Sequence, residues 1–278
     1  MVLTWAVPVE TKQVYTKYRL VPPKRKKKRT GGKVVGCLCT YVPEEILYAA
    51  DILPIRIFGG HEPSSVVEPH ILGMFCPFCR DTLAQGLEGK YDYLDGIVLA
   101  QSCLHMRQTF WSWKKHVPID FTYYLPMPHC NQAVGQNDYL RGEYVLFKEA
   151  VEKWVGQPIT TEALDRGIDI MNTNRKLCKQ VYEFRKARKP ALTGLEAMEL
   201  VLSGQMVDKR EHNEVIKSWL TELPGRELKR EVGTRLMIVG SEDDDREFVQ
   251  MVEGKLAFPA TFVVEDHCTG TRYFWNEV

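Results

Sequence analysis

The sequence lacks the features that mark membrane, secreted and nucleic-acid-binding proteins. No run of 18 apolar residues occurs, and the first residues do not combine a basic start with the long apolar stretch of a secretory signal. The formal net charge is +1, which gives no overall attraction to nucleic acid or to a membrane surface. We therefore expect a cytoplasmic protein that binds neither.

Two common ligand-binding motifs are also missing. The chain has no G-x-x-x-x-G-K-[ST] loop, so we do not expect it to bind ATP through one. A single Cys-x-x-Cys pair, Cys76 and Cys79, suggests thioredoxin-like redox chemistry or zinc. We discount this interpretation because a zinc site of that type needs a second pair, and the sequence contains none.

Cysteine, by contrast, is present eight times in the 278 residues. Disulfides are rare in the cytoplasm, so these residues are expected to be core filler, catalytic thiols or metal ligands. Cys39, Cys76 and Cys103 each adjoin an apolar segment at a predicted strand-to-helix junction, where open α/β sheets bind ligands. Their spacing is too wide for a zinc finger or a ferredoxin motif, which implies a cluster held between loops. This pattern is typical of a redox enzyme.

Alternating strand and helix patterns predict an α/β fold. We expect two Rossmann-like (flavodoxin-like) open-sheet domains with a helical insert between them, the second domain being truncated. The predicted parts are an irregular basic arm (1–32), a first α/β domain (33–128), a helical segment (129–232) and the start of a second α/β domain (233–278). Two strands and one helix cannot bury a doubly wound sheet, so either the chain continues further or the gap is filled by a partner subunit.

The spacing of apolar residues along the chain predicts the individual strands and helices. Strands are expected at 34–38, 55–58, 97–100, 121–125, 236–239 and 261–264, and helices at about 43–50, 80–87, 105–115, 139–154, 161–188, 194 onward and 244–253. Glu44 and Glu45 suit a first helical turn, where the helix dipole favours carboxylates, and Glu45 is also a candidate acid/base group. Six consecutive cations, Lys24 to Arg29, form either a solvated arm or a contact for coenzyme A phosphate or an acidic partner.

Eight segments, taken in order, resemble subunits of the 2-hydroxyacyl-CoA dehydratases and benzoyl-CoA reductases. They are GCLCTYVPEEILYAADILPIRIFG (36–59), CPFCR (76–80), YDYLDGIV (91–98), SCLHMR (102–107), NTNR (172–175), YEFR (182–185), PALTG (190–194) and DHCTGTRYF (266–274). The resemblance spans about residues 33 to 278. The resemblance rests on the order and number of these eight segments, and no single motif establishes it.

The resemblance implies a subunit with a [4Fe-4S] cluster on only three cysteines, so that one iron is open to substrate. Cys76 and Cys103 match ligand positions of the family. The third ligand usually lies beyond the Cys-Thr-Gly-Thr-Arg segment, and Cys268 is the candidate for it within this sequence. Cys39 matches a position near the open iron and is, with Glu45, the catalytic candidate. This sequence has leucine after Cys103, where the family commonly has aspartate.

Partners and a reaction also follow from the resemblance. The expected partners are an acyl-CoA substrate, a homologous second cluster subunit, an ATP-hydrolysing activator with its own iron-sulfur cluster, and ferredoxin as the upstream electron donor. The segments CTYVPEE (39–45) and FWSWK (110–114) favour an oxidoreductase subunit that reduces an aromatic acyl-CoA of the benzoyl-CoA type in anaerobic aromatic degradation. Two alternatives remain open: a radical 2-hydroxyacyl-CoA dehydratase subunit, which is a lyase, and a non-catalytic partner subunit whose cluster has four protein ligands or none.

Overall fold

The computed structural model describes residues 32–60, 64–130 and 132–278. The cationic run of the predicted arm lies outside these residues. The described residues form two compact units that meet in sequence between Asp169 and Ile170. The predicted helical segment 129–232 is therefore shared between the two units, and each unit is considered by itself below.

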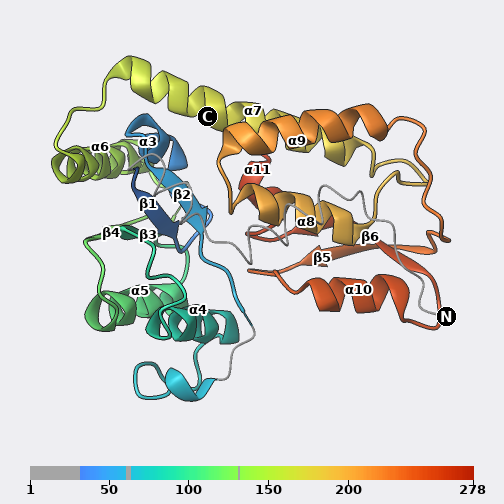
Figure 1. The fold of residues 1–278 in the computed structure, drawn as a ribbon, viewed down its shortest axis with the longest axis horizontal. Coiled ribbons are helices and arrows are strands. Elements are labelled where there is room, and N and C mark those ends of the chain that lie inside the picture. Colours follow the sequence, from blue (N-terminus) through green and yellow to red (C-terminus); the bar gives the residue numbers. More distant parts are fainter. Residues whose placement is uncertain (1–31, 61–63, 131) are drawn as a thin grey trace. The chain divides into compact units, whose positions relative to one another are not determined.

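The N-terminal unit is built on a four-stranded parallel sheet with the strand order β2-β1-β3-β4. Its elements are β1 (Val34–Cys37), α3 (Glu44–Ala49), β2 (Leu53–Arg56), the short 3-10 helix η1 (Ser64–Val66), α4 (Pro77–Leu87), β3 (Gly96–Ala100), α5 (Leu104–His116), β4 (Phe121–Leu125), α6 (Gln136–Val155) and the first part of α7 (Thr161–Glu183). Helices α3 and α6 lie on one side of this sheet, and α4 and α5 lie on the other (Figure 1). The α/β class predicted from the sequence is confirmed.

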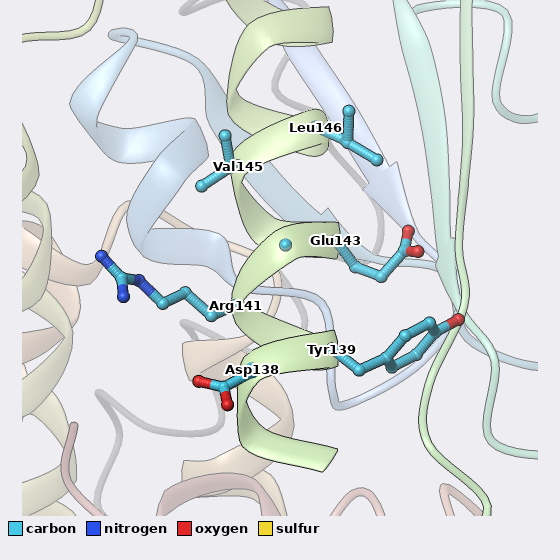
Figure 2. Close-up of a pocket in the computed structure, with 7 residues that line it drawn as sticks. Asp138, Tyr139, Arg141, Glu143, Val145 and Leu146 are labelled. Carbon is cyan, nitrogen blue, oxygen red and sulfur yellow. The ribbon is translucent and has the colours of Figure 1, made fainter. Parts of the chain in front are cut away.

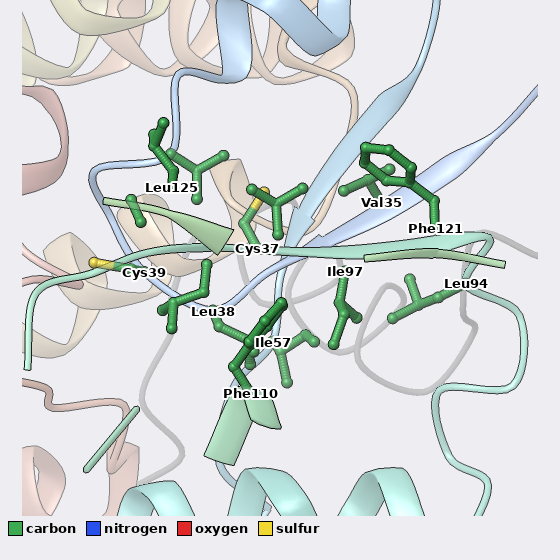
Figure 3. Close-up of a cluster of buried hydrophobic side chains, with 14 of the residues drawn as sticks. Val35, Cys37, Leu38, Cys39, Ile57, Leu94, Ile97, Phe110, Phe121 and Leu125 are labelled. Atoms are coloured by element: carbon green, nitrogen blue, oxygen red, sulfur yellow. The ribbon is translucent and has the colours of Figure 1, made fainter. Parts of the chain in front are cut away.

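The sheet is buried on both faces, as the continuous apolar runs in its strands predict. Every residue of β1 and β3 is buried. Two neighbouring tyrosines of β4 show the two layers, because Tyr123 packs on Phe147 of α6 whereas Tyr124 packs on Phe110 of α5. Figure 3 shows the apolar side chains that surround β1, with Cys37 and Cys39 among them. These two cysteines thus belong to the core.

Two predicted boundaries are wrong for local reasons. Strand β2 begins at Leu53, two residues before the predicted 55–58, so Pro54 lies inside the strand. Proline is tolerated there because β2 is an edge strand of the sheet, which among the described residues pairs only with β1. Helix α4 begins at Pro77, three residues before the predicted start, because proline suits the first helical position.

The C-terminal unit contains a two-stranded parallel sheet and a group of helices. Its elements are the remainder of α7, α8 (Gly194–Gly204), α9 (Lys209–Glu222), β5 (Thr234–Val239), α10 (Arg246–Gly254), β6 (Ala260–Asp266) and α11 (Thr271–Phe274). A capping box starts α8, in which Thr193 Oγ1 accepts from the N–H of Glu196 and the Glu196 carboxylate accepts from the N–H of Thr193. The predicted strand–helix–strand order of residues 234–266 is present.

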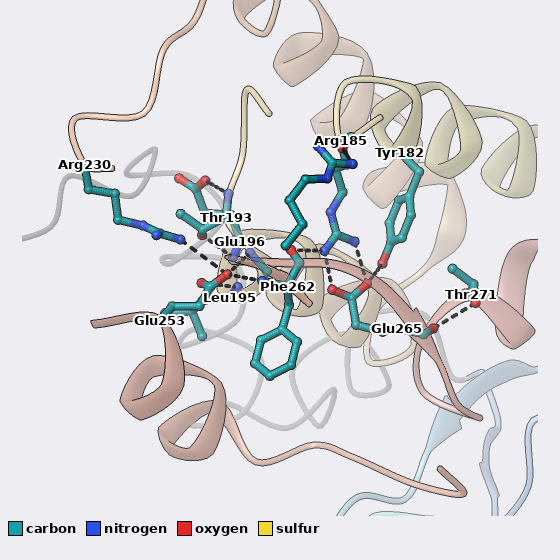
Figure 4. A network of polar contacts seen from close by, with 12 residues as sticks. Tyr182, Arg185, Thr193, Leu195, Glu196, Arg230, Glu253, Phe262, Glu265 and Thr271 are labelled. Atoms are coloured by element: carbon teal, nitrogen blue, oxygen red, sulfur yellow. Dashed lines mark hydrogen bonds and ion pairs between the residues drawn. The ribbon is translucent and has the colours of Figure 1, made fainter. Parts of the chain in front are cut away.

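A buried ion pair holds the end of α7 against β6 (Figure 4). The Arg185 guanidinium makes a two-pronged contact with the Glu265 carboxylate, and Arg185 Nη2 also donates to the carbonyl oxygen of Phe262 at 2.8 Å. Tyr182 Oη donates to Glu265 Oε2 at 2.9 Å. Tyr182 and Arg185 come from one family-like segment, YEFR, and both serve here to hold the unit together.

A second buried polar group, His212 of α9, is neutral in the folded state. Its Nδ1 lies 2.8 Å from Asn174 Nδ2, and its Nε2 lies 3.0 Å from the carbonyl oxygen of Leu200. An amide nitrogen can only donate and a carbonyl oxygen can only accept, so the proton is on Nε2. Burial, with the nearby Lys209 ammonium as a second cause, lowers the pKa of His212 to about 3.

We expect His212 to make the C-terminal unit sensitive to acid. The unfolded chain takes up a proton on this imidazole near its ordinary pKa of 6.5, whereas the folded chain does so only near pH 3. The free energy of unfolding therefore falls as the pH drops from about 6.5 towards 3, by about 1.4 kcal/mol for each pKa unit of the difference.

Urea unfolding of the full chain at several pH values, compared with the His212→Gln variant, isolates this effect. The comparison is needed because burial raises the pKa of Asp243 to about 6, which stabilises the fold on acidification over part of the same range. Glutamine can still accept from Asn174 and donate to Leu200, so the variant loses the titration with little change in its contacts. Parallel pH curves for the two proteins would contradict the prediction.

Among the described residues, no helix has both the length and the apolar character needed to span a membrane.

Candidate cysteine cluster site

Two cysteines stand at the starts of neighbouring helices. Cys76 is the N-cap residue of α4, and Cys103 is the N-cap residue of α5, where its Sγ accepts from the N–H of Met106 at 3.3 Å. The unpaired N–H groups and the dipole at a helix start favour negative charge. The sulfur of Cys103 is therefore placed where a thiolate, or an anionic group bound to it, is stabilised.

The two helices are held side by side by close packing and by two hydrogen bonds. Gly86 of α4 leaves room for the Trp113 indole of α5, since an added Cβ would lie only 2.7 Å from that ring. Thr109 Oγ1 of α5 donates to the carbonyl oxygen of Cys79 at 3.0 Å. At the helix starts, the N–H of Cys76 donates to His105 Nδ1 at 2.9 Å. These contacts fix the cysteine-bearing ends of α4 and α5 next to each other.

A third sulfur, that of Cys79, joins the first two. Cys79 lies three positions after Cys76, and this spacing places both side chains on one face of the helix start. Its thiol hydrogen-bonds to Cys103 Sγ and also interacts with Cys76. This hydrogen bond, helped by the N–H groups of Met106 and His105, lowers the pKa of Cys103 to about 5. The same bond, together with burial, raises the pKa of Cys79 well above its usual value.

The site lies at the switch point of the sheet. Strand β1 connects through α3 to β2 on one side, whereas β3 pairs with β1 on the other side and leads on to β4. Open α/β sheets bind ligands in the crevice at such a reversal, outside the carboxyl ends of the strands. Cys39 follows the end of β1 and Cys103 follows the end of β3, so both are at this edge.

The other predicted site residues are distributed over both units. Cys39 is buried, with 3% of its surface exposed, and Glu45 is buried in the first turn of α3. Cys268 lies in the C-terminal unit just after β6, where its N–H donates to the carbonyl oxygen of Ser241 at 2.8 Å. The structure thus brings Cys76 and Cys103 together within one unit.

The three sulfurs fit an iron-sulfur group better than a single metal ion. In the part of the chain that the structure describes, no set of three or more His, Cys, Asp or Glu side chains is arranged to hold one metal ion. A cluster takes one thiolate for each iron, so its ligands need not converge on a single point. Soft sulfur donors at two helix starts, one of them exposed to solvent, match that requirement.

Sequence reasoning does not identify the contacts that build this site. Cys79 is discounted in the sequence because there is no second Cys-x-x-Cys pair, yet its partner is the distant Cys103. His105 and Thr109 connect the two helices, and their spacing of four positions on α5 is the available signal. This spacing can be interpreted only when the position of the neighbouring helix α4 is known.

A separate surface hollow lies along α6 (Figure 2). It is lined by Asp138, Tyr139, Arg141, Gly142, Glu143, Val145 and Leu146, all from this one helix. None of these residues is a cysteine, and the hollow is not part of the cluster site.

Comparison with known proteins identifies the family of the chain. Residues 39–278 match the family described as 2-hydroxyglutaryl-CoA dehydratase, D-component. The chain is 28% identical over 251 residues to one of the subunits of the benzoyl-CoA reductase of Thauera aromatica, and this match covers 88% of this chain and 64% of that protein. It is 25% identical over 227 residues to the beta subunit of the (R)-phenyllactyl-CoA dehydratase of Clostridium sporogenes, covering 81% and 60% respectively.

A third relative is the beta subunit of the (R)-2-hydroxyglutaryl-CoA dehydratase of Acidaminococcus fermentans, which is 25% identical over 220 residues, covering 77% of this chain and 57% of that protein. The fold and the cysteine site are those of an α/β protein with clustered thiols. The chain belongs to the 2-hydroxyglutaryl-CoA dehydratase D-component family, which confirms the resemblance seen in the sequence. It spans less than two thirds of the length of these three relatives.

Proposed function

We propose that this chain is the iron-sulfur subunit of an ATP-coupled reductase that transfers low-potential electrons to an aromatic acyl-CoA of the benzoyl-CoA type. The observation that carries the proposal is the meeting of Cys76 and Cys103 at the switch point of a sheet in this family. The match to the benzoyl-CoA reductase of Thauera aromatica supports the reductase assignment, because it extends over 88% of the chain, against 81% and 77% for the two dehydratase subunits.

The proposed cofactor is a [4Fe-4S] cluster, with Cys76 and Cys103 as ligands and Cys268 as the candidate from the C-terminal unit. When bound, such a cluster supplies one-electron transfer at a potential set by its ligands and their hydrogen bonds. In this chain, the Cys79 thiol and the N–H groups of Met106 and His105 stabilise the thiolate of Cys103. Its exposure leaves that sulfur accessible from solvent.

Two further residues are proposed to act on the substrate. Cys39 is at the same edge of the sheet as Cys103, so it is the candidate to face an acyl group bound there. Glu45 lies in the first turn of the helix that follows, and its carboxylate is the candidate to hold or deliver a proton. Burial of both side chains suits a site from which water is excluded during the reaction.

The proposed partners follow from the sequence of the chain and from its relatives. The sequence contains no phosphate-binding loop of the P-loop type, so ATP hydrolysis is assigned to a separate activator with its own cluster. The related proteins are named as subunits, which supports a homologous partner subunit here. Ferredoxin is the proposed donor to the activator, and an acyl-CoA is the proposed substrate.

A second candidate function is that of a 2-hydroxyacyl-CoA dehydratase subunit. It is supported by the beta subunits of phenyllactyl-CoA and 2-hydroxyglutaryl-CoA dehydratases among the relatives. In that case the electron is recycled, and water is lost from a 2-hydroxyacyl-CoA.

Product analysis separates the two functions. The chain, co-expressed anaerobically with its partner subunit, is mixed with activator, ATP, reductant and one thioester at a time. We expect benzoyl-CoA to yield a dienoyl-CoA with continuous ATP consumption. A 2-enoyl-CoA formed from a 2-hydroxyacyl-CoA after a single activation would instead establish the dehydratase. A cluster whose spectrum is unchanged by every thioester would identify a non-catalytic partner subunit.

A further inference from the structure

Among the described residues, the start of α4 has no side-chain cap from its own helix. The N-cap residue, Cys76, makes no side-chain cap hydrogen bond, and Pro77 at the first helical position has no N–H. In a capping box, a Glu or Gln side chain at the third helical position accepts from the N-cap N–H. Here that position is Cys79, whose sulfur is a weak acceptor.

The missing acceptor comes from the neighbouring helix α5. The N–H of Cys76 donates to His105 Nδ1 at 2.9 Å. An amide N–H can only donate, so Nδ1 is the acceptor in this contact. The imidazole therefore takes the part that a Glu or Gln side chain of the same helix plays in a capping box.

The same imidazole packs against Phe75, the residue that precedes the N-cap. The two ring centroids lie 5.0 Å apart, with the planes inclined at 64°. A residue at this position often packs against an apolar residue at the fourth helical position of its own helix. In α4 that position is Arg80, whose Nη1 donates instead to the carbonyl oxygen of Gly73 at 3.4 Å. His105 thus replaces both contacts of a local helix start.

The start of α5, by contrast, is capped by its own residues, because Cys103 Sγ accepts from a backbone N–H of the same helix. His105 lies two positions after Cys103, so one turn of α5 carries a cysteine of the site and the side chain that holds Cys76. The α4 contacts of Thr109 and Trp113 lie about one and two turns further along α5. His105 therefore acts at the level of the cysteines themselves.

We propose that His105 is a positioning residue that holds Cys76 beside Cys103 before any metal is bound. Without its acceptor, the start of α4 is free to move relative to α5 while the rest of the helix pair stays packed. The role concerns the metal-free chain. Its consequence for a cluster rests on the proposed function, because prearranged ligands bind more tightly than ligands that must first be ordered.

The test is the cross-linking of Cys76 to Cys103 in the metal-free full chain, kept anaerobic, with the short bifunctional thiol reagent dibromobimane. Mass spectrometry quantifies the linked peptides, and a monofunctional reagent measures the reactivity of each thiol separately. His105→Phe keeps a ring for Phe75 but has no acceptor. We expect its linking rate to fall about twofold to tenfold, the range that corresponds to the net free energy of one hydrogen bond.

The matched control is His116→Phe, which makes the same change in an exposed histidine at the other end of α5. It should link at the wild-type rate. A rate in His105→Phe equal to that of the control would overturn the inference.

A second pair of variants tests the position of the acceptor. His105→Asn places a carbonyl oxygen at the position that corresponds to Nδ1, whereas His105→Gln places it one bond further out. We expect the asparagine variant to keep most of the wild-type linking rate and the glutamine variant to lose as much as His105→Phe. Folding is checked by circular dichroism, and this pair decides the question if the phenylalanine variant does not fold. Equal rates in the two variants would contradict the role of Nδ1.

Iron binding separates this inference from the proposed function. After reconstitution with ferrous iron and sulfide, we expect His105→Phe to bind iron about tenfold more weakly, an effect typical of residues that orient metal ligands. If the wild-type chain binds no cluster, the proposed function is wrong, and the linking rates still decide the role of His105. If the wild type binds a cluster and no His105 variant changes the linking rate, the function stands and the inference is wrong.

Discussion

Cys103→Ala is expected to abolish the brown absorbance of the anaerobically prepared chain and its partner subunit. Cys103 combines the features that a cluster ligand needs. It starts a helix, two backbone N–H groups and the Cys79 thiol stabilise its thiolate, and its sulfur is accessible from solvent. Alanine removes the only thiol at this helix start, because α5 itself contains no cysteine.

The measurement is iron per chain together with the visible spectrum. Cys130→Ala is the matched control, because Cys130 is also an exposed free cysteine but is not part of the sulfur group. We expect wild-type iron in the control and near-complete loss in Cys103→Ala. Equal iron in the two variants would show that the cysteine site holds no cluster, and zinc in place of iron would show a structural metal site.

Parts of this site can be predicted from the sequence because the ends of buried strands can be recognised in it. Apolar runs identify β1 and β3, and the residues that follow a parallel strand lie at its carboxyl edge, which points to Cys39 and Cys103. Cys76 stands at a predicted junction as well, and the family resemblance also identifies it as a ligand position. The proximity of Cys79 to Cys103 cannot be predicted, because it depends on the packing of α4 against α5. That contact is made by Gly86 and Trp113, whose complementarity is a property of the folded chain.

The fold shows the same division between local and tertiary effects. The boundaries of the helices and the buried strands are predicted to within a few residues. Burial of one face of a helix, or of both faces of a strand, imposes a recognisable pattern of apolar residues on the sequence. Pro54 is predicted to lie between a helix and a strand, yet it lies inside β2. Its tolerance there depends on β2 being an edge strand, which only the tertiary packing decides. The YEFR segment stands out through the family resemblance, but its structural role depends on Glu265, which lies 80 positions beyond Arg185.

That ion pair leads to the largest expected effect on stability. Arg185 and Glu265 are 1% and 2% exposed, and Arg185 Nη1 lies 2.5 Å from Glu265 Oε2. In Arg185→Met the Glu265 carboxylate stays buried without its cation, and Tyr182 is the donor that remains to it among the described residues. Removing one partner of a buried pair costs about 3–5 kcal/mol, so we expect a decrease of this size in the free energy of unfolding of the C-terminal unit.

The neighbouring residue provides the control. Lys186 pairs with Glu183 at 2.6 Å, but both side chains are largely exposed, so Lys186→Met should change the free energy of unfolding by no more than about 1 kcal/mol. Urea unfolding followed by circular dichroism measures both variants in the full chain. If Arg185→Met costs no more than Lys186→Met, the buried pair does not stabilise the unit.

The double variant Arg185→Met/Glu265→Gln tests the cause of the loss. Glutamine carries no charge, and its side-chain oxygen can still accept from Tyr182 Oη. Since the penalty in Arg185→Met comes from an uncompensated buried carboxylate, neutralising that carboxylate should restore part of the lost stability. A double variant as unstable as the sum of the two single variants would indicate that the contacts of Arg185 with the backbone, such as that with Phe262, are what the unit requires.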